Sequence, residues 1–470
     1  MKELYEYDEE YRDSIATVDA QGKRVWIYPK KPKGKFFNAR KIVSVILLTI
    51  LFAGPFIKIN GQPFLMMNIF ERKFVILGAV FWPQDFFIFA LGLITFFVFI
   101  ILFTVVFGRV WCGWACPQTL FMEMVFRRIE YWIEGDANQQ RKLAKMPWNG
   151  EKIKKRLLKH SIFVIIAVLI GHTAMAYLIG IEKVQEIVSQ PPSENLAGFF
   201  GLIAFSAVFY GVFAYLREQA CIAICPYGRL QGVLLVRDSM AVMYDWIRGE
   251  PRGKMKKSEV QADKGDCIDC KLCVHVCPTG IDIRNGTQLE CVNCTACIDV
   301  CDDVMTKIDK PTGLIRIASH NAIADGKKRV FTPRVAGYTG VLVALIALLT
   351  IFVSSRSDIQ ATILRTPGML YQKVENDQIQ NVYSIQLINK TIDDMNVHLR
   401  LIDHESGVIE VVGGNEIKLL SSGKADAVFT VRLPESEMEG NKNSITVGIF
   451  QGDVLIDKVK TNFLGPIKFK

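Results

Sequence analysis

Five apolar runs are spread along the chain as far as residue 353. They cover residues 42–57, 86–107, 161–181, 196–216 and 335–353. A helix needs roughly 20 residues to cross a hydrocarbon core about 30 Å thick. The first run is short and contains Pro55, and a further run at 64–82 is interrupted by the letters NIFERK. We therefore expect five membrane spans and an interfacial segment at 64–82.

After the last run, the pattern changes to short alternations of apolar and polar residues. VYSIQLIN, VHLRLID, VIEVVG, AVFTVRL and SITVGIF alternate in this way. The turn-forming stretches DHESG, SSGK and LPESEMEGNKN separate several of them. Many short alternating strands predict an antiparallel β-sandwich of about 100 residues. It contains no cysteine, so it would fold without a disulfide.

Basic residues orient the predicted spans. YPKKPKGKFFNARK precedes the first span, and EKIKKRLLK precedes the third. The loop 182–195 has one Lys, no Arg and three Glu, whereas the loop 217–334 is basic again. Loops rich in Lys and Arg stay in the cytoplasm. We therefore expect the N-terminus and these basic loops in the cytoplasm, and the β-sandwich outside it.

The overall composition agrees with a membrane protein of several domains. Half of the 470 residues are hydrophobic, and the net charge of +9 is explained by the cytoplasmic loops. No nucleic-acid-binding signature is present, so we expect no nucleic-acid partner. All 12 cysteines lie between Cys112 and Cys301, which excludes a disulfide scaffold and places them on the predicted reducing side.

Eight of the cysteines form two copies of the spacing C-x2-C-x2-C-x3-C. In this ferredoxin pattern, three cysteines of one copy and the last cysteine of the other hold each [4Fe-4S] cluster. The first predicted cluster has the ligands Cys267, Cys270, Cys273 and Cys301. The second has the ligands Cys291, Cys294, Cys297 and Cys277. The alternative is a pair of structural zinc sites, but zinc has no need of a third C-x2-C step.

The first copy is followed by Pro278, whereas the second has Asp302 in place of the usual proline. Proline donates no ligand, so this departure casts little doubt on the second cluster. Two neighbouring clusters of this kind usually transfer single electrons. A purely structural role is the alternative.

The remaining four cysteines form two C-x3-C-P motifs. They are Cys112 and Cys116 after the second span, and Cys221 and Cys225 after the fourth. On a continuing helix each pair would share a face, but Pro117 and Pro226 predict that each helix breaks or restarts there. Because both motifs end even-numbered spans, they lie at one membrane face. Four converging thiolates suit Cu(I), zinc or an iron–sulfur cluster, and the alternative is packing of helix ends.

Other polar residues in or beside the spans are weaker candidates. His172 lies within the third span, where a histidine usually has a function. It could bind copper or a haem, relay protons, or bond to a neighbouring helix. Gln84 and Asp85 lie at the start of the second span. They could form a quinone or proton site, or they could anchor the chain at the membrane interface.

Together these patterns predict a multi-domain protein: a helical membrane domain with about five spans, an inserted dicluster ferredoxin-like domain and an all-β immunoglobulin-like sandwich. The predicted parts are a cytoplasmic segment 1–40, a four-span membrane domain 41–234, a cytoplasmic ferredoxin-like domain 235–334, a fifth span 335–354 and a periplasmic sandwich 355–470.

The combination resembles the accessory proteins of cbb3-type cytochrome c oxidases called CcoG, FixG or RdxA. The matching stretches are RVWIYPKKPKGKF, FWPQDF, RVWCGWACPQTLF, GHTAMAY, REQACIAICPYGRLQ and the double ferredoxin run followed by DDVM. The C-terminal strands match the immunoglobulin-like domain of this family. The C-x3-C-P element by itself is less specific, because it also occurs in membrane quinol-dehydrogenase subunits of the NapH type.

The resemblance implies a multi-pass protein of the bacterial inner membrane that helps to mature the oxidase. It would act as an oxidoreductase that reduces Cu(II) to Cu(I), with oxidase subunits or copper-delivery proteins as partners and an unknown electron donor. The copper or redox thiols would be Cys112, Cys116, Cys221 and Cys225, with His172 as a tentative copper ligand. The alternatives are a membrane quinol oxidase that reduces another protein, and a non-enzymatic assembly scaffold.

Overall fold

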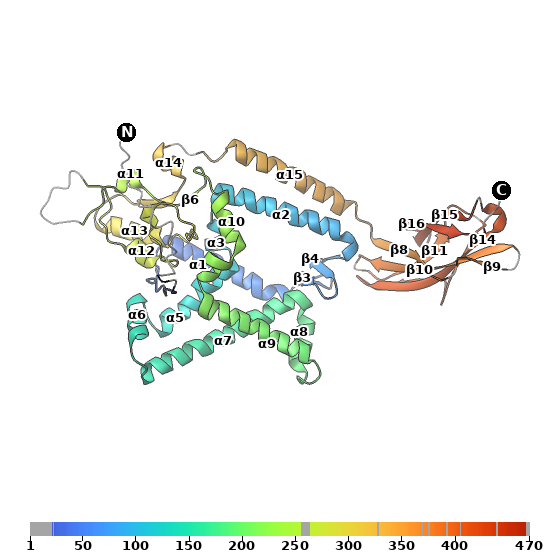
Figure 1. The fold of residues 1–470 in the computed structure, drawn as a ribbon, viewed down its shortest axis with the longest axis horizontal. Coiled ribbons are helices and arrows are strands. Elements are labelled where there is room, and N and C mark those ends of the chain that lie inside the picture. Colours follow the sequence, from blue (N-terminus) through green and yellow to red (C-terminus); the bar gives the residue numbers. More distant parts are fainter. Residues whose placement is uncertain are drawn as a thin grey trace. The chain divides into compact units, whose positions relative to one another are not determined.

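The computed structural model describes residues 21, 23–254, 264–326, 329–368, 370–374, 377–391, 393–404, 406–438 and 440–466 (Figure 1). Most of the predicted segment 1–40, namely residues 1–20 and 22, lies outside the described residues. The chain forms two compact units. The first comprises Met1–Pro55 and Leu91–Ala347, and the second Phe56–Ala90 and Leu348–Lys470.

Five helices are long and apolar enough to cross a membrane, as predicted. They are α1 (Lys35–Ala53) with the 3-10 turn η2 (Gly54–Phe56), α2 (Phe86–Phe107), α7 (Gly150–Ile179), α9 (Leu196–Gly211) with η5 (Val212–Leu216), and α15 (Pro333–Ser354). Helix α7 begins well before the predicted start at 161. Asn149 caps it, because its side-chain oxygen accepts the backbone N–H of Lys152 at 2.9 Å, and the charged stretch that follows favours a helix.

Aromatic packing joins the helices of the first unit. Helices α7 and α9 lie side by side (Figure 1). The segment after the first C-x3-C-P motif packs against both helices through Phe126. The centroid of its ring lies 4.7 Å from that of Phe163 and 4.6 Å from that of Phe213. The intervening elements are α3 (Val110–Trp114), α4 (Pro117–Leu120), η4 (Phe121–Phe126), α5 (Arg127–Ile133), α6 (Ala137–Lys145) and α8 (Ile181–Ser189).

The ferredoxin-like segment also belongs to the first unit. Strands β6 (Ala241–Tyr244) and β7 (Ile315–Ala318) pair in antiparallel fashion around it. Helices α12 (Leu272–Val276) and α13 (Ala296–Lys307) each begin inside a cysteine run, after its second cysteine, and they pack on each other. Shorter elements are η6 (Ala220–Ile224), α10 (Pro226–Leu234), α11 (Trp246–Gly249), η7 (Ile283–Asn285) and α14 (His320–Ala324).

The second unit contains the predicted β-sandwich. One sheet has the order β12-β14-β10-β8, with β9 also paired to β10, and the other has the order β13-β11-β15-β16. The strands are β8 (Ile359–Arg365), β9 (Gln372–Val374), β10 (Gln378–Asn389), β11 (Met395–Leu401), β12 (Val408–Val411), β13 (Ile417–Leu419), β14 (Lys424–Pro434), β15 (Lys442–Gln451) and β16 (Val454–Leu464). The turn η8 (Glu435–Glu437) follows β14. Apolar residues from both sheets form one buried core, as the alternation predicted.

The segment 64–82, expected at the interface, is a three-stranded antiparallel meander of the second unit. Its strands are β3 (Leu65–Asn68), β4 (Lys73–Ile76) and β5 (Ala79–Phe81), and the short pair β1 (Lys58–Ile59) and β2 (Gln62–Pro63) precedes them. In the next turn, η3 (Pro83–Asp85), the buried Asp85 carboxylate contacts Arg356 at 2.7 Å and Lys390 at 2.6 Å. These ion pairs favour the anchor interpretation of Asp85, while the side chain of Gln84 lies outside the described part of the chain.

Candidate metal centres

The two ferredoxin runs repeat one local backbone conformation. In each run, the residues before and after the second cysteine have positive φ: Asp269 and Lys271 in the first, Asn293 and Thr295 in the second. Non-glycine residues rarely adopt this conformation, and it is maintained mainly at functional sites. Alternation of right- and left-handed residues turns successive backbone N–H groups inward, which is how many iron–sulfur loops provide donors. Both runs are therefore folded to surround an anionic group.

Two small cavities are lined by the cysteines of these runs. One is lined by Cys267, Cys270, Cys273 and Cys301. The other is lined by Cys277, Cys291, Cys294 and Cys297, with Cys273 at its edge. The two sets correspond to the two predicted ligand sets, including the exchange of the fourth cysteine between the copies. The ligand roles themselves stay a prediction.

Buried arginines lie beside both cavities. Arg284 lines the first cavity and is held by Asp282 and Asp269, each at 2.6 Å. Arg40 and Arg109 are close enough to the second set of cysteines to affect the pKa of Cys294 and Cys291, respectively. Arg40 Nη2 and Arg109 Nε are buried without a hydrogen-bond partner among the described residues. Unpartnered donors beside four thiols fit an anionic iron–sulfur cluster.

Burial raises the pKa of several of these thiols when no metal is bound. The pKa of Cys273 rises to about 12 although Arg284 opposes the shift, and that of Cys294 rises to about 11 although Arg40 opposes it. Without a metal, these two thiols are therefore protonated at neutral pH. A metal deprotonates a coordinating thiol, so loading of the sites would release protons.

The C-x3-C-P motifs break their helices where the prolines predicted. Cys116 and Cys225 have extended backbone, and Pro117 and Pro226 begin α4 and α10. A residue before proline is driven out of the helical region by the proline ring. The two copies differ at their first cysteine, because Cys112 lies in α3 whereas Cys221 lies in the π-helix η6, a form that often marks functional sites. The two cysteines of each pair therefore do not share one helix face, as they would on a continuous helix.

Each C-x3-C-P motif contacts residues that follow the other motif in the chain. The Cys112 thiol lies 3.4 Å from the side-chain oxygen of Gln231 on α10, which follows the second motif. Conversely, the Thr119 hydroxyl, which follows the first motif, lies 4.0 Å from the Cys221 sulfur. Burial and, to a smaller extent, the neighbouring Cys116 raise the pKa of Cys112 to about 11 and that of Cys221 to about 12. The thiols of the two motifs are therefore close enough to influence one another electrostatically.

The first C-x3-C-P motif packs directly on the second ferredoxin run. A Cβ atom added to Gly113 would lie 2.4 Å from the carbonyl oxygen of Val292 and 2.9 Å from that of Asn293. These two residues separate Cys291 from Cys294. Arg40 strengthens the contact, because its Nε donates a hydrogen bond to the Gly113 carbonyl at 2.6 Å. Only glycine permits this close approach of two backbones.

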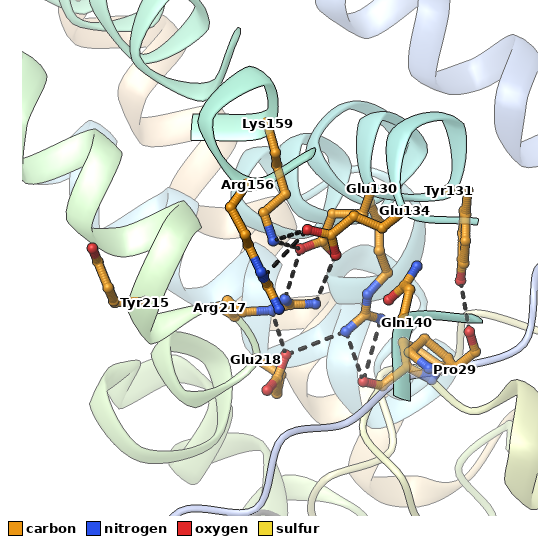
Figure 2. Close-up of polar contacts among 12 residues, drawn as sticks. Pro29, Glu130, Tyr131, Glu134, Gln140, Arg156, Lys159, Tyr215, Arg217 and Glu218 are labelled. Carbon is orange, nitrogen blue, oxygen red and sulfur yellow. Dashed lines mark hydrogen bonds and ion pairs between the residues drawn. The ribbon is translucent and has the colours of Figure 1, made fainter. Parts of the chain in front are cut away.

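A buried ion-pair network surrounds the start of the second C-x3-C-P motif (Figure 2). Arg217 donates two hydrogen bonds to Glu130, at 2.9 and 3.1 Å. The backbone of Arg217 has a φ of +54°, which is unusual for a residue other than glycine. Lys159 contacts Glu134 at 2.9 Å and Glu130 at 3.6 Å. Burial opposes ionisation of Glu130, but the charges of Arg217 and Lys159 outweigh it and lower the pKa of this carboxyl. The ion pairs thus hold Arg217 in its strained backbone conformation.

Arg127 extends this network to the ferredoxin-like segment. It contacts Glu218 at 3.2 Å and donates to the carbonyl of Pro278, which follows Cys277, at 3.3 and 3.4 Å. A second link runs from α13 to α1, where the Asp299 carboxylate accepts the backbone N–H of Phe37 at 2.7 Å. Within the first unit, polar contacts therefore link the cysteine runs to the membrane helices and to the segment after the first C-x3-C-P motif.

His172 lies apart from the thiols. Its Nδ1 lies 2.8 Å from the carbonyl of Val168, one turn earlier on α7, and it lines a cavity between α7, α8 and α9 to which no described cysteine contributes. Its copper role stays a prediction. Among the described residues, no three His, Cys, Asp or Glu side chains surround a point that would hold a single metal ion. The ligands of a four-iron cluster lie farther apart than those of one ion.

Several residues of the site were not identified from the sequence. Arg40 was recognised only as part of the basic stretch before the first span, and Gly113 and Glu130 were not singled out. The spacing of Glu130 and Glu134, four residues apart, and of Arg156 and Lys159, three apart, was a usable signal. Such pairs share a helix face, and charges at the end of a span require partners.

Three family models match the chain. A model described as a 4Fe-4S dicluster domain matches residues 216–320, and one described as a 4Fe-4S binding domain matches residues 89–136. A model described as an immunoglobulin-like fold at the C-terminus of FixG matches residues 349–466. The iron–sulfur matches include both C-x3-C-P motifs as well as the ferredoxin runs.

Curated relatives cover most of the chain. Protein RdxB of Cereibacter sphaeroides is 35% identical over 80% of this chain and 81% of its own length. Protein RdxA of the same organism is 35% identical over 89% of this chain and 90% of its own length. The nitrogen fixation protein FixG of Rhizobium meliloti is 32% identical over 83% of this chain and 82% of its own length. The chain therefore belongs to the FixG/RdxA family and is an iron–sulfur electron-transfer protein with membrane-spanning helices.

Proposed function

We propose that this protein is a cupric reductase of the bacterial inner membrane that supplies Cu(I) during assembly of a cbb3-type cytochrome oxidase. Two [4Fe-4S] clusters would supply one-electron transfer when bound. Cys267, Cys270, Cys273 and Cys301 would hold one of them, and Cys291, Cys294, Cys297 and Cys277 the other. The Cu(I) would pass to oxidase subunits or copper-delivery proteins.

The packing of α3 on the second ferredoxin run carries this proposal. Gly113 follows Cys112 and contacts the residues between Cys291 and Cys294. Thiols that can bind a soft metal therefore lie beside a segment suited to a one-electron carrier. Reduction of Cu(II) to Cu(I) takes one electron, and Cu(I) prefers thiolate ligands. Because the described thiols form no preformed cage for a single ion, they would have to close on copper.

The basic loops support a matching topology. The cysteine motifs would lie in the cytoplasm, where thiols stay reduced, and the β-sandwich in the periplasm. The proposed division of the chain is the one given by the sequence: segment 1–40, membrane domain 41–234, ferredoxin-like domain 235–334, fifth span 335–354 and sandwich 355–470.

A reduction assay with a Cu(I) chelator tests the proposal. The protein with its iron bound is reduced with dithionite, freed of excess reductant and given Cu(II) with bathocuproine. We expect about two Cu(I) per protein, one electron from each of two clusters. Exchange of Cys112 and Cys221 for serine should slow the reaction at least tenfold with no loss of iron. No Cu(I) above that formed by buffer would refute the proposal.

A second candidate follows from the family model that covers residues 89–136, which is described as a 4Fe-4S binding domain. The four C-x3-C-P thiols could hold an additional iron–sulfur cluster instead of copper. Iron content separates the two cases. Two clusters give about eight iron atoms per chain and three give about twelve, at four per cluster. Serine in place of Cys112 and Cys221 would lower the iron content only in the second case.

A further inference from the structure

A cavity of about 470 Å³ lies between α7, α8 and α9. Its walls are mostly apolar and include Val164 of α7, Ile187 of α8 and Leu202 of α9. On α9 the lining runs from Phe199 to Tyr210, which is about 16 Å at the helical rise per residue. Apolar cavities of this size with a few convergent polar groups are the usual binding sites of small molecules.

One polar group in this cavity lacks a partner. Ser206 is only 7% exposed, and its hydroxyl has no hydrogen-bond partner among the described residues. It faces α7, since a Cβ atom added to Gly171 would lie 2.6 Å from the Ser206 oxygen. A buried hydroxyl without a partner is unusual and indicates a missing ligand or water.

His172, the neighbour of Gly171, provides a second polar group at the same level. Its Nδ1 lies 2.8 Å from the Val168 carbonyl, which can only accept a hydrogen bond. Nδ1 therefore carries the hydrogen, and in the neutral ring Nε2 is left as an acceptor. The cavity thus offers a hydroxyl that can donate and a ring nitrogen that can accept.

Tyr210 connects the cavity to charged groups. Its hydroxyl lies 2.9 Å from Nδ1 of His160 on α7. His160 lines a separate polar cavity together with Glu134, Lys159 and Arg217. Chains of Asp, Glu and His side chains conduct protons in membrane proteins. Tyr210 therefore lies in the wall of the apolar cavity and is hydrogen-bonded to His160, which lines the cavity beside the ion-pair network of Figure 2.

We propose that this cavity binds the ring of a membrane quinone or its hydroquinone. A ring hydroxyl would donate to His172 Nε2, a ring oxygen would accept from Ser206, and the apolar tail would lie along α9. A phospholipid chain would fill the apolar walls, but it would leave the Ser206 hydroxyl unpaired and make no use of the link from Tyr210 to His160.

The bound hydroquinone would donate electrons to the iron–sulfur centres, and this is the one point at which the inference rests on the proposed function. Binding depends on α7, α8 and α9 and needs no iron. The two proposals can therefore fail separately: a protein that binds quinone without reducing Cu(II) would refute the first and leave the second standing.

Photoaffinity labelling of the full-length protein in lipid nanodiscs tests the site. An azido-substituted decylbenzoquinone is the probe, and labelled peptides are located by mass spectrometry. We expect labelling in α7 and α9 that unlabelled decylbenzoquinone suppresses and added phospholipid does not. Ser206→Ala should weaken binding about fivefold, and Ala207→Phe, which narrows the cavity, should abolish labelling.

Ile165→Phe is the matched control, because Ile165 lies on α7 but is 67% exposed and does not line the cavity. It should bind the probe as the unmodified protein does. Labelling that is absent, equal in all variants or suppressed equally by phospholipid would overturn the inference. Folding of each variant is checked by its thermal unfolding midpoint, and retained folding with lost labelling in Ala207→Phe supports the proposal.

Discussion

The arginines beside the cysteine cavities are the residues with the strongest expected effect on electron transfer. A positive charge close to a cluster favours its reduced, more negative form and raises its reduction potential. Arg40 meets this condition at the second cavity, where it is buried and keeps one donor unpartnered among the described residues. Arg284 meets it at the first cavity, although two aspartates share its charge.

Arg40→Gln should lower the potential of one of two [4Fe-4S] centres by about 60 mV, equivalent to a tenfold change for a one-electron couple. Glutamine can still donate to the Gly113 carbonyl, so the loss is chiefly one of charge. A redox titration followed by EPR measures the shift. Arg40→Lys, which keeps the charge, should change the potential much less, and equal shifts in both variants would exclude the electrostatic explanation.

The ion pair of Arg217 and Glu130 should be costly to break on one side only. Both side chains are almost fully buried. Arg217→Met should lower the free energy of unfolding by about 3 kcal/mol, because the buried Glu130 loses both of its short hydrogen bonds and keeps only the longer contact with Lys159. The double variant Arg217→Met with Glu130→Leu should regain most of this loss. Thermal unfolding in detergent compares them, and a double variant no more stable than the single one would contradict the interpretation.

Sequence reasoning at this scale identified the cysteines but not the residues around them. Spacing alone groups the eight ferredoxin cysteines, because a cluster requires ligands at fixed short intervals. The contact between Arg40 and Gly113, or between Gly113 and Val292, joins residues far apart in the chain. No local pattern reveals such a contact, since it depends on how the helices pack.

At the scale of elements, the five spans and five of the β-strands follow from apolar runs and alternation. The predicted limits of α2 and α9 with η5 agree with the structure. The meander β3–β5 was not anticipated, because its strands are very short and interrupted by the polar NIFERK stretch. Strand β16 was also missed, although VLIDKVKTNF alternates in part. The π-helices η4, η5 and η6 were not anticipated either, because they have no sequence signature of their own.

The contact of α3 with the second ferredoxin run gives an element-scale prediction. In Gly113→Ala the new methyl group would lie 2.4 Å from the Val292 carbonyl oxygen, so one backbone must move. We expect loss of part of the iron and at least tenfold slower Cu(I) formation. Gly201→Ala on α9 is the control, because nothing lies within 4 Å of its Cβ position. If both variants behave alike, the contact has no role in electron transfer.

For the whole molecule, the sequence predicted membrane helices, a ferredoxin-like segment and a β-sandwich in one chain. The family models for iron–sulfur domains and for an immunoglobulin-like fold agree with this prediction. The sequence did not anticipate that the described parts of the N-terminal segment, most of the membrane helices and the ferredoxin-like segment form one compact unit. That unit is held by the contacts of Arg127 with Pro278 and of Asp299 with Phe37. These contacts join separate stretches of sequence, each of which looks complete by itself.

The proposed topology predicts opposite labelling of the two ends of the molecule. Asp453 of the β-sandwich and Lys307 of α13 have side chains that are 95% and 68% exposed. Asp453→Cys should react with a membrane-impermeant maleimide in intact spheroplasts, and Lys307→Cys only after lysis. The reverse order would contradict the positive-inside assignment.

The central claim is that electrons reach copper from the iron–sulfur centres of this chain. EPR of the purified, dithionite-reduced protein, freed of excess reductant, tests it when Cu(II) is added in sub-stoichiometric steps. The account predicts two interacting signals of reduced [4Fe-4S] centres that decline as the added copper becomes EPR-silent Cu(I). Reduced iron–sulfur signals that persist beside an undiminished Cu(II) signal would contradict it.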